Sequence, residues 1–367
     1  MKQSVPAGKN KVSQFDFVNN LIQRELRQLL EGDAPKNEAE ARAKSRMYYK
    51  SCVDRDSINA NSVKAMKKMV DDLGGLLLTV DVDVDAKWNL DDLLAKRSKY
   101  SLSSFFSVGV GADDKNVSTN IIQISQGGLG LGDDTRDYYL NKTVEKDPVM
   151  LAYATMLQKY AEIVVGESNV QMAEIFNVLR FEQELAKIQL SQAEMRDPNA
   201  NYHKLNIAWL QKNSKFTNWV NLFNSIFAFA GYSVDSDQPV LVYSTHYIQK
   251  IVSVVEKYLS TAQGKRTLQN YVVLMVLNDY APNLSDDFQA AYNKFRTVYA
   301  GTQGAPETWQ NCVSDTDSSL GFALGAIYVD KYFTAKEKKK AAFVIDSIIG
   351  TFRTRVENVC DDHISVI

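Results

Sequence analysis

Apolar residues near the N-terminus recur at the spacing of a helix that buries one face. They follow one another at intervals of three or four residues, a period that places them on one side of an α-helix. The residues are Phe15, Val18, Ile22, Leu26 and Leu29. The pattern predicts helices over residues 15–29, 38–52 and 62–73, the last ending at Gly74-Gly75, where glycine is typical of a helix C-terminus.

Between residues 105 and 124 the pattern changes to that of extended chain. Apolar residues stand on both sides of the polar stretch Asp113-Asp114-Lys115-Asn116, and this arrangement predicts a small β-hairpin. The glycines of 127–132 do not spell the GxGxxG of a phosphate-binding loop, and no βαβ pattern surrounds them. We interpret them as a turn that leaves the hairpin.

Long helices are expected to dominate the rest of the chain. Asp147-Pro148 supplies an N-cap with proline at the first helical position. The predicted helices cover residues 148–165, 170–192, 216–230, 245–260, 264–280, 285–299, 319–333 and 335–358. No fixed-period repeat is visible. The predicted fold is therefore mainly α: an irregular multi-helix domain with a small β-hairpin.

Composition narrows the classes of function. The chain of 367 residues carries 44 acidic and 42 basic side chains, with a formal net charge of -2, which gives no field that would gather nucleic acid. The basic stretch 336–340 is interpreted as a solvated helix start. Apolar runs such as Tyr271 to Leu277 are far shorter than the roughly 20 residues that a membrane helix needs. We therefore expect no nucleic acid partner and no membrane span.

Two features point to different compartments. Residues 1–8 lack the apolar stretch of a secretory signal, which by itself predicts a cytosolic protein. Three glycosylation sequons begin at Asn116, Asn141 and Asn283. Each lies in a polar, loop-like stretch, so together they favour a secretory parent.

Metal-binding patterns are weak in this sequence. A zinc peptidase site needs two histidines one helical turn apart and a glutamate, whereas His203, His246 and His363 are far apart and no HExxH occurs. The aspartates at 81, 83 and 85 lack the glycine and terminal glutamate of a calcium loop, and we interpret them as a solvated linker. The three cysteines are scattered and lack metal-type spacing.

Several phrases occur in order along nearly the whole chain. They are Ala43-Lys44 with Tyr48-Tyr49-Lys50-Ser51-Cys52; Leu73-Gly74-Gly75; Gln126 with Gly128-Leu129 and Arg136-Asp137-Tyr138-Tyr139-Leu140; Arg196-Asp197 with Tyr202; and Trp309 with Cys312, Leu324-Gly325, Tyr328-Val329 and Phe333. Together these phrases resemble the neprilysin and endothelin-converting enzyme family of zinc metallopeptidases. The resemblance covers about Pro6 to Arg355 and matches the N-terminal helical part of that family.

The resemblance implies a helical, substrate-enclosing domain over residues 1–359, followed by a divergent tail over 360–367. It implies a disulfide between Cys52 and Cys312 that closes a loop of about 260 residues, worth roughly 4–5 kcal/mol by chain entropy, with Cys360 left free. It also implies an extracellular or cell-surface location. If the chain is cytosolic instead, all three cysteines are ordinary thiols.

The chemistry of this family belongs to its zinc-binding half. There a metal-bound water, deprotonated by the HExxH glutamate, attacks the peptide carbonyl. None of those groups occurs in this sequence, so no cofactor is expected here and the chain alone is predicted to be inactive. The family's two substrate-carboxylate arginines fall at Lys11 and Asn19: lysine keeps the charge without the bidentate fork, and asparagine keeps neither. Lys11 is the one candidate substrate-binding residue.

Two hypotheses of function remain open. In the first, the chain is the N-terminal portion of a neprilysin-like metalloendopeptidase that cleaves small peptides when the catalytic half is present. In the second, it is a stand-alone, non-catalytic protein that binds peptides or pairs with a homologous subunit. A generic helical scaffold is a third alternative.

Overall fold

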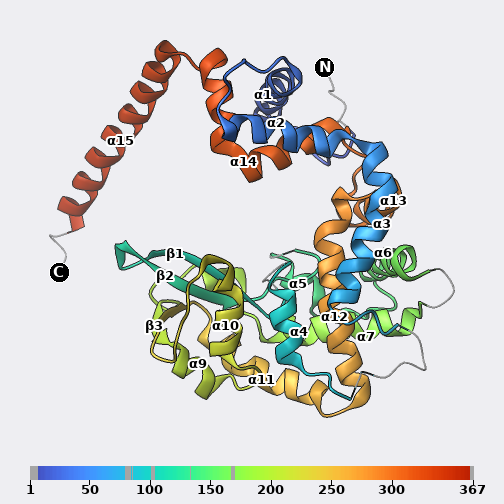
Figure 1. Ribbon diagram of the computed structural model, residues 1–367. Coiled ribbons are helices and arrows are strands. Elements are labelled where there is room, and N and C mark those ends of the chain that lie inside the picture. Colours follow the sequence, from blue (N-terminus) through green and yellow to red (C-terminus); the bar gives the residue numbers. More distant parts are fainter. Residues whose placement is uncertain are drawn as a thin grey trace. The chain divides into compact units, whose positions relative to one another are not determined.

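The chain folds into two compact units. The computed structural model describes residues 7–78, 84, 86–100, 104–132, 134–166 and 170–363, with side chains up to residue 358. One unit, here called the terminal unit, combines Met1–Arg55 with Gln303–Ile367, and the other, the central unit, is Asp56–Thr302 (Figure 1). The aspartates at 81, 83 and 85 lie outside the described residues.

The terminal unit is built from helices at the two ends of the chain. Helices α1 and α2 pack along α14, so segments far apart in sequence lie together (Figure 1). The helices are α1 (Gln14–Glu31), α2 (Glu40–Val53), α14 (Thr308–Tyr332) and α15 (Ala335–His363). Helices α1, α2 and α14 share a small core that contains Leu26, Leu30, Tyr49, Cys312, Val313 and Leu324.

A buried arginine joins α1 to α2. The last carbonyl groups of a helix have no partner within the helix, and at the end of α1 the Arg46 guanidinium fills this role. It donates to the carbonyl oxygens of Leu29, Leu30 and Gly32. Its Nε lies 2.9 Å from Glu38 Oε1. The cation therefore complements the negative end of the helix dipole while Glu38 balances its charge.

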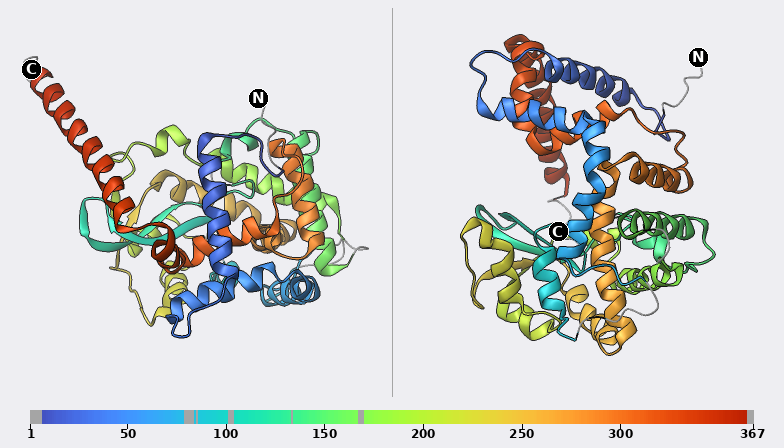
Figure 2. Two further views of the ribbon diagram at one scale, coloured as in Figure 1. Left: turned by 90° about the horizontal axis from the view of Figure 1, so that it is seen from above. Right: turned by 45° about the vertical axis from the view of Figure 1, so that its right-hand side comes forward.

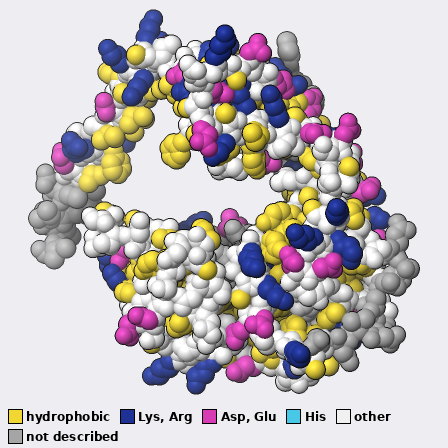
Figure 3. Space-filling model, viewed as in Figure 1, with side chains coloured by type: hydrophobic (Ala, Val, Ile, Leu, Met, Phe, Trp, Pro, Cys, Tyr) yellow, Lys and Arg dark blue, Asp and Glu magenta, His cyan; other side chains and the backbone are white. Residues whose placement is uncertain are grey.

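Helix α15 exposes a long apolar stripe. In Figure 3 these side chains form a yellow band along the helix. They are Phe343, Val344, Ile345, Ile348, Ile349, Phe352 and Val356. Among the described residues, none of the helices combines the length and apolar character that crossing a membrane requires.

The central unit is organised around one almost fully buried helix. Between Arg266 and Leu277 every side chain of α12 (Ala262–Tyr280) is buried, so neighbours must cover it on all sides. Helices α6 (Pro148–Val165), α7 (Met172–Ile188) and α11 (Thr245–Leu259) pack against it. The remaining helices of eight or more residues are α3 (Arg55–Asp72), α4 (Leu90–Arg97), α10 (Trp219–Phe227) and α13 (Asp286–Ala300).

A four-stranded sheet completes the central unit, in the order β1-β2-β4-β3. The predicted hairpin is present as β1 (Phe106–Asp113) and β2 (Asn116–Gln126). Strands β3 (His203–Asn206) and β4 (Pro239–Val242) were not predicted. Because β4 pairs with β2 only at residues 122–124, the tip of the hairpin extends past the shorter strands (Figure 2).

The mainly helical fold is confirmed, with differences at particular elements. The expected helix 170–192 is α7 followed by the short α8 (Gln192–Met195), and 216–230 is α10 followed by a 3-10 turn. Helix α14 begins at Thr308 rather than 319, and its backbone is non-helical at Leu320, φ -134°. The predicted start was therefore placed at an internal kink.

Candidate functional site

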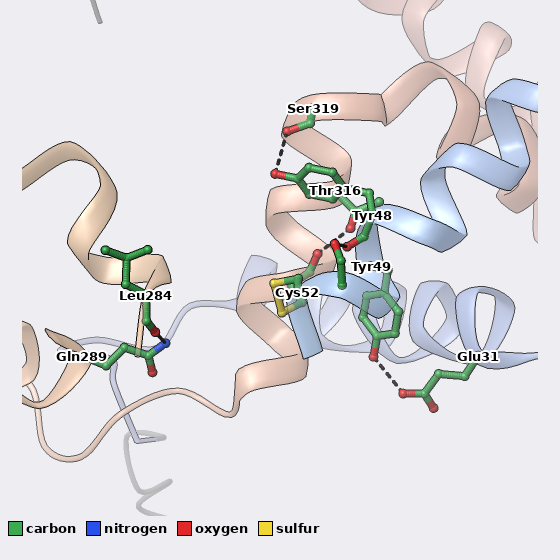
Figure 4. Close-up of a disulfide and its surroundings, with 10 residues drawn as sticks. Glu31, Tyr48, Tyr49, Cys52, Leu284, Gln289, Thr316 and Ser319 are labelled. Atoms are coloured by element: carbon green, nitrogen blue, oxygen red, sulfur yellow. Dashed lines mark hydrogen bonds between the residues drawn. A yellow bond between two sulfur atoms is a disulfide. The ribbon is translucent and has the colours of Figure 1, made fainter. Parts of the chain in front are cut away.

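The disulfide that the family resemblance implies is present in the terminal unit. It joins Cys52 near the end of α2 to Cys312 in α14, with their Cα atoms 5.6 Å apart (Figure 4). Hydrogen bonds flank it on both sides: Ser319 and Tyr48 hydroxyls lie 3.3 Å apart, and the Tyr49 hydroxyl donates to Glu31 at 2.8 Å. The side chain of Cys360 lies outside the described residues.

Lys11 lies at the entrance to α1. It is exposed, two residues before Ser13, which forms a capping box with Asp16. The neighbouring Lys9 forms the ion pair with Asp16, at 2.6 Å from Nζ to Oδ1. These hydrogen bonds, led by that from Lys9, hold the pKa of Asp16 well below its usual value. The role of Lys11 in substrate binding stays a prediction, as does the lack of a carboxylate contact at Asn19.

The three sequon asparagines are exposed in the central unit. Asn116 begins β2 at the hairpin turn. Asn141 follows α5 (Arg136–Tyr139) in the left-handed region, with φ 58°. Asn283 ends the 3-10 turn before α13. Their accessibility permits glycosylation, which remains a prediction.

A fully buried carboxyl group holds the glycine-rich loop that follows the hairpin. Glu182 on α7 has no exposed surface (0%). Its Oε1 accepts the Gly130 amide at 2.6 Å, and its Oε2 accepts the Tyr139 hydroxyl at 3.3 Å. Burial raises the pKa of Glu182 to about 7, against the lowering effect of the Gly130 amide.

Glycine is required at position 130 because the backbone passes close to another side chain. A Cβ at this position would lie 1.7 Å from the Tyr153 hydroxyl oxygen. The glycine-rich stretch is thus a packed turn, as the sequence pattern predicts. Its dependence on Glu182 was missed, since a lone glutamate in a helix carries no sequence signal.

The stretches shared with the family also fix this loop. The Gln126 amide group exchanges two hydrogen bonds with the backbone of Leu190, at 2.8 and 3.1 Å. Gln189 Nε2 donates to the Gly127 carbonyl at 2.7 Å, and Arg136 Nε donates to the Gln189 carbonyl at 3.0 Å. These residues therefore tie the end of β2 and α5 to the end of α7.

A second buried carboxylate fixes the tip of the hairpin. Asp113 accepts from Lys204 Nζ at 2.8 Å and from the Tyr202 hydroxyl at 2.8 Å. These bonds, led by the one from Lys204, together with the Lys115 amide, lower the pKa of Asp113 to about 2. Tyr202, the tyrosine of the family's arginine-aspartate-tyrosine motif, thus links β3 to the hairpin.

Zinc has no fitting site among the described side chains, because they contain no group of three His, Cys, Asp or Glu residues placed to hold a metal ion. We therefore derive no zinc-dependent step for this chain. The polar clusters above position backbone and loops.

Comparison with known proteins agrees with this architecture. The chain is 32% identical over 357 residues to neprilysin-3 of Drosophila melanogaster, covering 97% of this chain and 45% of that protein. It is 32% identical over 351 residues to endothelin-converting enzyme 1 of Bos taurus, covering 95% and 45% respectively. The chain thus spans about half the length of these curated relatives.

Solved structures show the same fold. PepO from Lactobacillus rhamnosis superposes with a TM-score of 0.79 at 17% identity, covering 97% of this chain and 53% of that one. The zinc metalloprotease Zmp1 of Mycobacterium tuberculosis, in complex with inhibitor, gives a TM-score of 0.75 at 17% identity, over 97% and 51%. The sequence model of peptidase family M13 matches residues 1–360, so the chain belongs to this family.

Proposed function

We propose that this chain is the substrate-enclosing, non-catalytic portion of a zinc metalloendopeptidase that cleaves small peptides when its catalytic half is present. The observation that carries the proposal is the match of nearly all of this chain to under half of each metallopeptidase relative. Zinc would be held, and peptide bonds broken, by the part of those relatives that this chain does not match. The contribution of this chain is enclosure and selection of the peptide.

The exposed stripe of α15 supports this proposal. Apolar side chains such as Phe343, Ile348 and Phe352 lie on one helix without a cover among the described residues. A contiguous apolar surface of this kind is typical of a protein interface. The same stripe also fits the alternative function, a stand-alone peptide-binding protein that pairs with a homologous subunit.

The disulfide and the exposed sequons support an extracellular or cell-surface location. Disulfides persist in oxidising compartments and are rare in the cytosol. A location outside the cytosol would also bring the complete protein together with extracellular peptides.

A fusion experiment tests the proposed function. The chain alone should not cleave a fluorogenic peptide, with or without added zinc. Fused ahead of the catalytic half of neprilysin-3, it should give turnover that a chelator abolishes, and short peptides should be cleaved in preference to folded proteins. The catalytic half alone is the control.

Chelator-sensitive turnover by the isolated chain would contradict the assignment of catalysis to the other half. A soluble, folded fusion without activity, next to an active full-length relative, would favour the stand-alone alternative. The substitution Lys11→Ala in the active fusion then tests the candidate substrate contact, and we expect it to raise the KM. Lys9→Ala in the same fusion is the matched control.

A further inference from the structure

The sheet of the central unit has one long strand edge that no other described strand covers. In the order β1-β2-β4-β3, strand β1 lies at one end and pairs only with β2 among the described strands (Figure 1). It has eight residues, which at 3.4 Å per residue make an edge of about 27 Å. This edge is therefore long enough for a further strand of ordinary length.

The hydrogen bonds of β2 show which main-chain groups of β1 point outward. The Tyr243 amide donates to the Ile124 carbonyl at 2.9 Å, so Ile124 turns its main-chain groups toward β4. Successive residues of a strand alternate in this respect, so Gln123 turns toward β1, where it stands opposite Gly109. Gly109 therefore bonds to β2, and the residues on either side of it turn their N–H and C=O groups away from the sheet.

These outward groups belong to Val108 and Val110. No strand in the described part of the chain lies beside them, and the Val110 side chain is 59% exposed. The regular edge ends at Ala112, where the register shifts and the carbonyl accepts a hydrogen bond from Gln123 Nε2 at 3.0 Å. The free edge of β1 thus offers two main-chain donors and two acceptors in the spacing of a β-ladder.

This edge lacks the features that usually prevent pairing with another chain. Proteins protect their sheet edges with charged side chains, proline or very short strands. Residues 107–112 contain neither a charged residue nor proline. The opposite edge of the sheet is β3, which has only four residues and carries Lys204. Of the two edges, β1 is therefore the one suited to accept a strand.

The two faces of β1 differ in the side chains that an added strand would meet. Val108 and Val110 stand on the face of Ile124 and Ile122, which lie opposite them on β2. The other face carries glycine, and a Cβ added at Gly109 would meet no atom within 4 Å. An added strand would therefore place β-branched residues beside the valines and has room for large side chains beside the glycine.

We propose that the free edge of β1 binds an extended peptide, which joins the sheet as a strand through main-chain hydrogen bonds to Val108 and Val110. Main-chain bonds give such a complex its affinity, and alternate side chains give it specificity. Two copies of this chain paired edge to edge here would set glycine against glycine, whereas a peptide with alternating β-branched and aromatic residues fills both faces. Because it takes the peptide to be a substrate of the complete enzyme, this proposal rests on the proposed function.

Calorimetric titration of the purified chain tests the proposal. The probe is acetyl-lysyl-valyl-tyrosyl-valyl-tyrosyl-valyl-lysinamide. The matched control carries N-methyl groups on the central valine and the tyrosine after it, which block both edges of the peptide because adjacent N–H groups point to opposite sides. We expect the control to bind at least about tenfold more weakly, the effect of one or two main-chain hydrogen bonds.

Hydrogen exchange locates the bound peptide. Exchange of the segment 106–113 should slow when the probe is added, while that of β3 should not change. The same should hold in the fusion with the catalytic half of neprilysin-3. Protection of the segment in the fusion before peptide is added would assign the edge to the catalytic half and overturn the proposal.

Two substitutions at one position separate main-chain from side-chain contacts. Val110→Pro removes an outward N–H without removing a bond to β2, a place where an edge strand tolerates proline, and should weaken probe binding about tenfold. Val110→Thr keeps both the N–H and the β-branched shape, and should bind within about twofold of the parent. Circular dichroism shows whether each variant is folded, and the N-methylated peptide gives the same test without a substitution.

Four outcomes would overturn the proposal. They are no binding of the probe at about 1 mM, equal affinity for the N-methylated control, equal losses in Val110→Pro and Val110→Thr, and a dimer of the chain that Val110→Pro dissociates, which would assign the edge to a second copy. Because binding is measured without catalysis, each of these results would leave the activity of the fusion, and so the proposed function, standing.

Discussion

The Glu182 carboxyl couples the stability of the central unit to pH. Its ordinary pKa is 4.5 and its pKa in the folded chain is about 7, so the folded protein holds a proton that the unfolded chain has already lost. Between these values stability must fall as pH rises. The full shift corresponds to about 3 kcal/mol, since one pKa unit is worth about 1.4 kcal/mol.

We predict that Glu182→Gln removes this pH dependence. The glutamine keeps an oxygen for the Gly130 amide but cannot ionise. Urea unfolding at pH 4.5, 6 and 7.5 should show the parent losing stability across the series, with a flatter profile for the variant. Parallel profiles would show that Glu182 does not titrate in this range. Glu184→Gln, whose side chain pairs with Lys257 at the surface, is the matched control.

Glycosylation is a second test at single residues. When the chain is secreted under an added signal peptide, at least one of Asn116, Asn141 and Asn283 should carry glycan, because all three are exposed. Glycosidase treatment should increase gel mobility, and replacing the occupied asparagine by glutamine should remove the shift. Unchanged mobility of secreted protein would count against the secretory assignment.

At the scale of elements, Arg46 decides how firmly α1 is held. We predict that Arg46→Ala lowers the free energy of unfolding of the terminal unit by about 3–5 kcal/mol, because it leaves Glu38 and the final α1 carbonyl groups without their shared partner. Denaturant titration followed by tryptophan fluorescence, to which Trp309 on the terminal-unit core contributes, checks this expectation.

Lys44→Ala is the matched control for Arg46. Lys44 and Glu40 form an exposed pair one turn apart on α2, and such pairs contribute about 0.5 kcal/mol. Equal losses in the two variants would show that the buried cap is no stronger than a surface ion pair.

Elements were predictable where the signal is local. The cap at Asp147-Pro148 fixes the start of α6, which begins at Pro148 as expected, and alternation about the turn fixes the hairpin. Strands β3 and β4 have only four residues each, too few for a periodic pattern. Strand β4 forms along the free edge of β2, and β3 pairs with β4. Helix α4 was missed because its eight residues are too few to show a clear helical spacing of apolar positions.

The candidate sites divide in the same way. The pairing of Cys52 with Cys312 could be inferred because the family resemblance reaches both residues. The glycines of 127–132 could be interpreted as a turn, but the reason for Gly130 is a tyrosine from α6 and a glutamate from α7. Nothing in the sequence near Asp113 indicates that Tyr202 and Lys204 reach its carboxylate. Such convergence depends on packing between distant segments.

At the scale of the whole molecule, the disulfide closes a loop with a sequence separation of 260. Removing it by Cys52→Ser should lower stability by about 5 kcal/mol on the chain-entropy account. The shift in unfolding midpoint should appear in tryptophan fluorescence, and Cys360→Ser should leave the midpoint unchanged. Peptide mapping of secreted protein should recover the Cys52–Cys312 pair. Three free thiols, or pairing through Cys360, would contradict the assignment.

The insertion of the central unit between Cys52 and Cys312 has a consequence for limited proteolysis. A single cut at any bond between residues 56 and 302 leaves one fragment with Cys52 and the other with Cys312. The two fragments stay covalently joined, so a nicked molecule runs as one species on a gel until a reductant is added. Because α1 and α2 remain tied to α14 after such a cut, one nick severs the chain without releasing either end of the terminal unit.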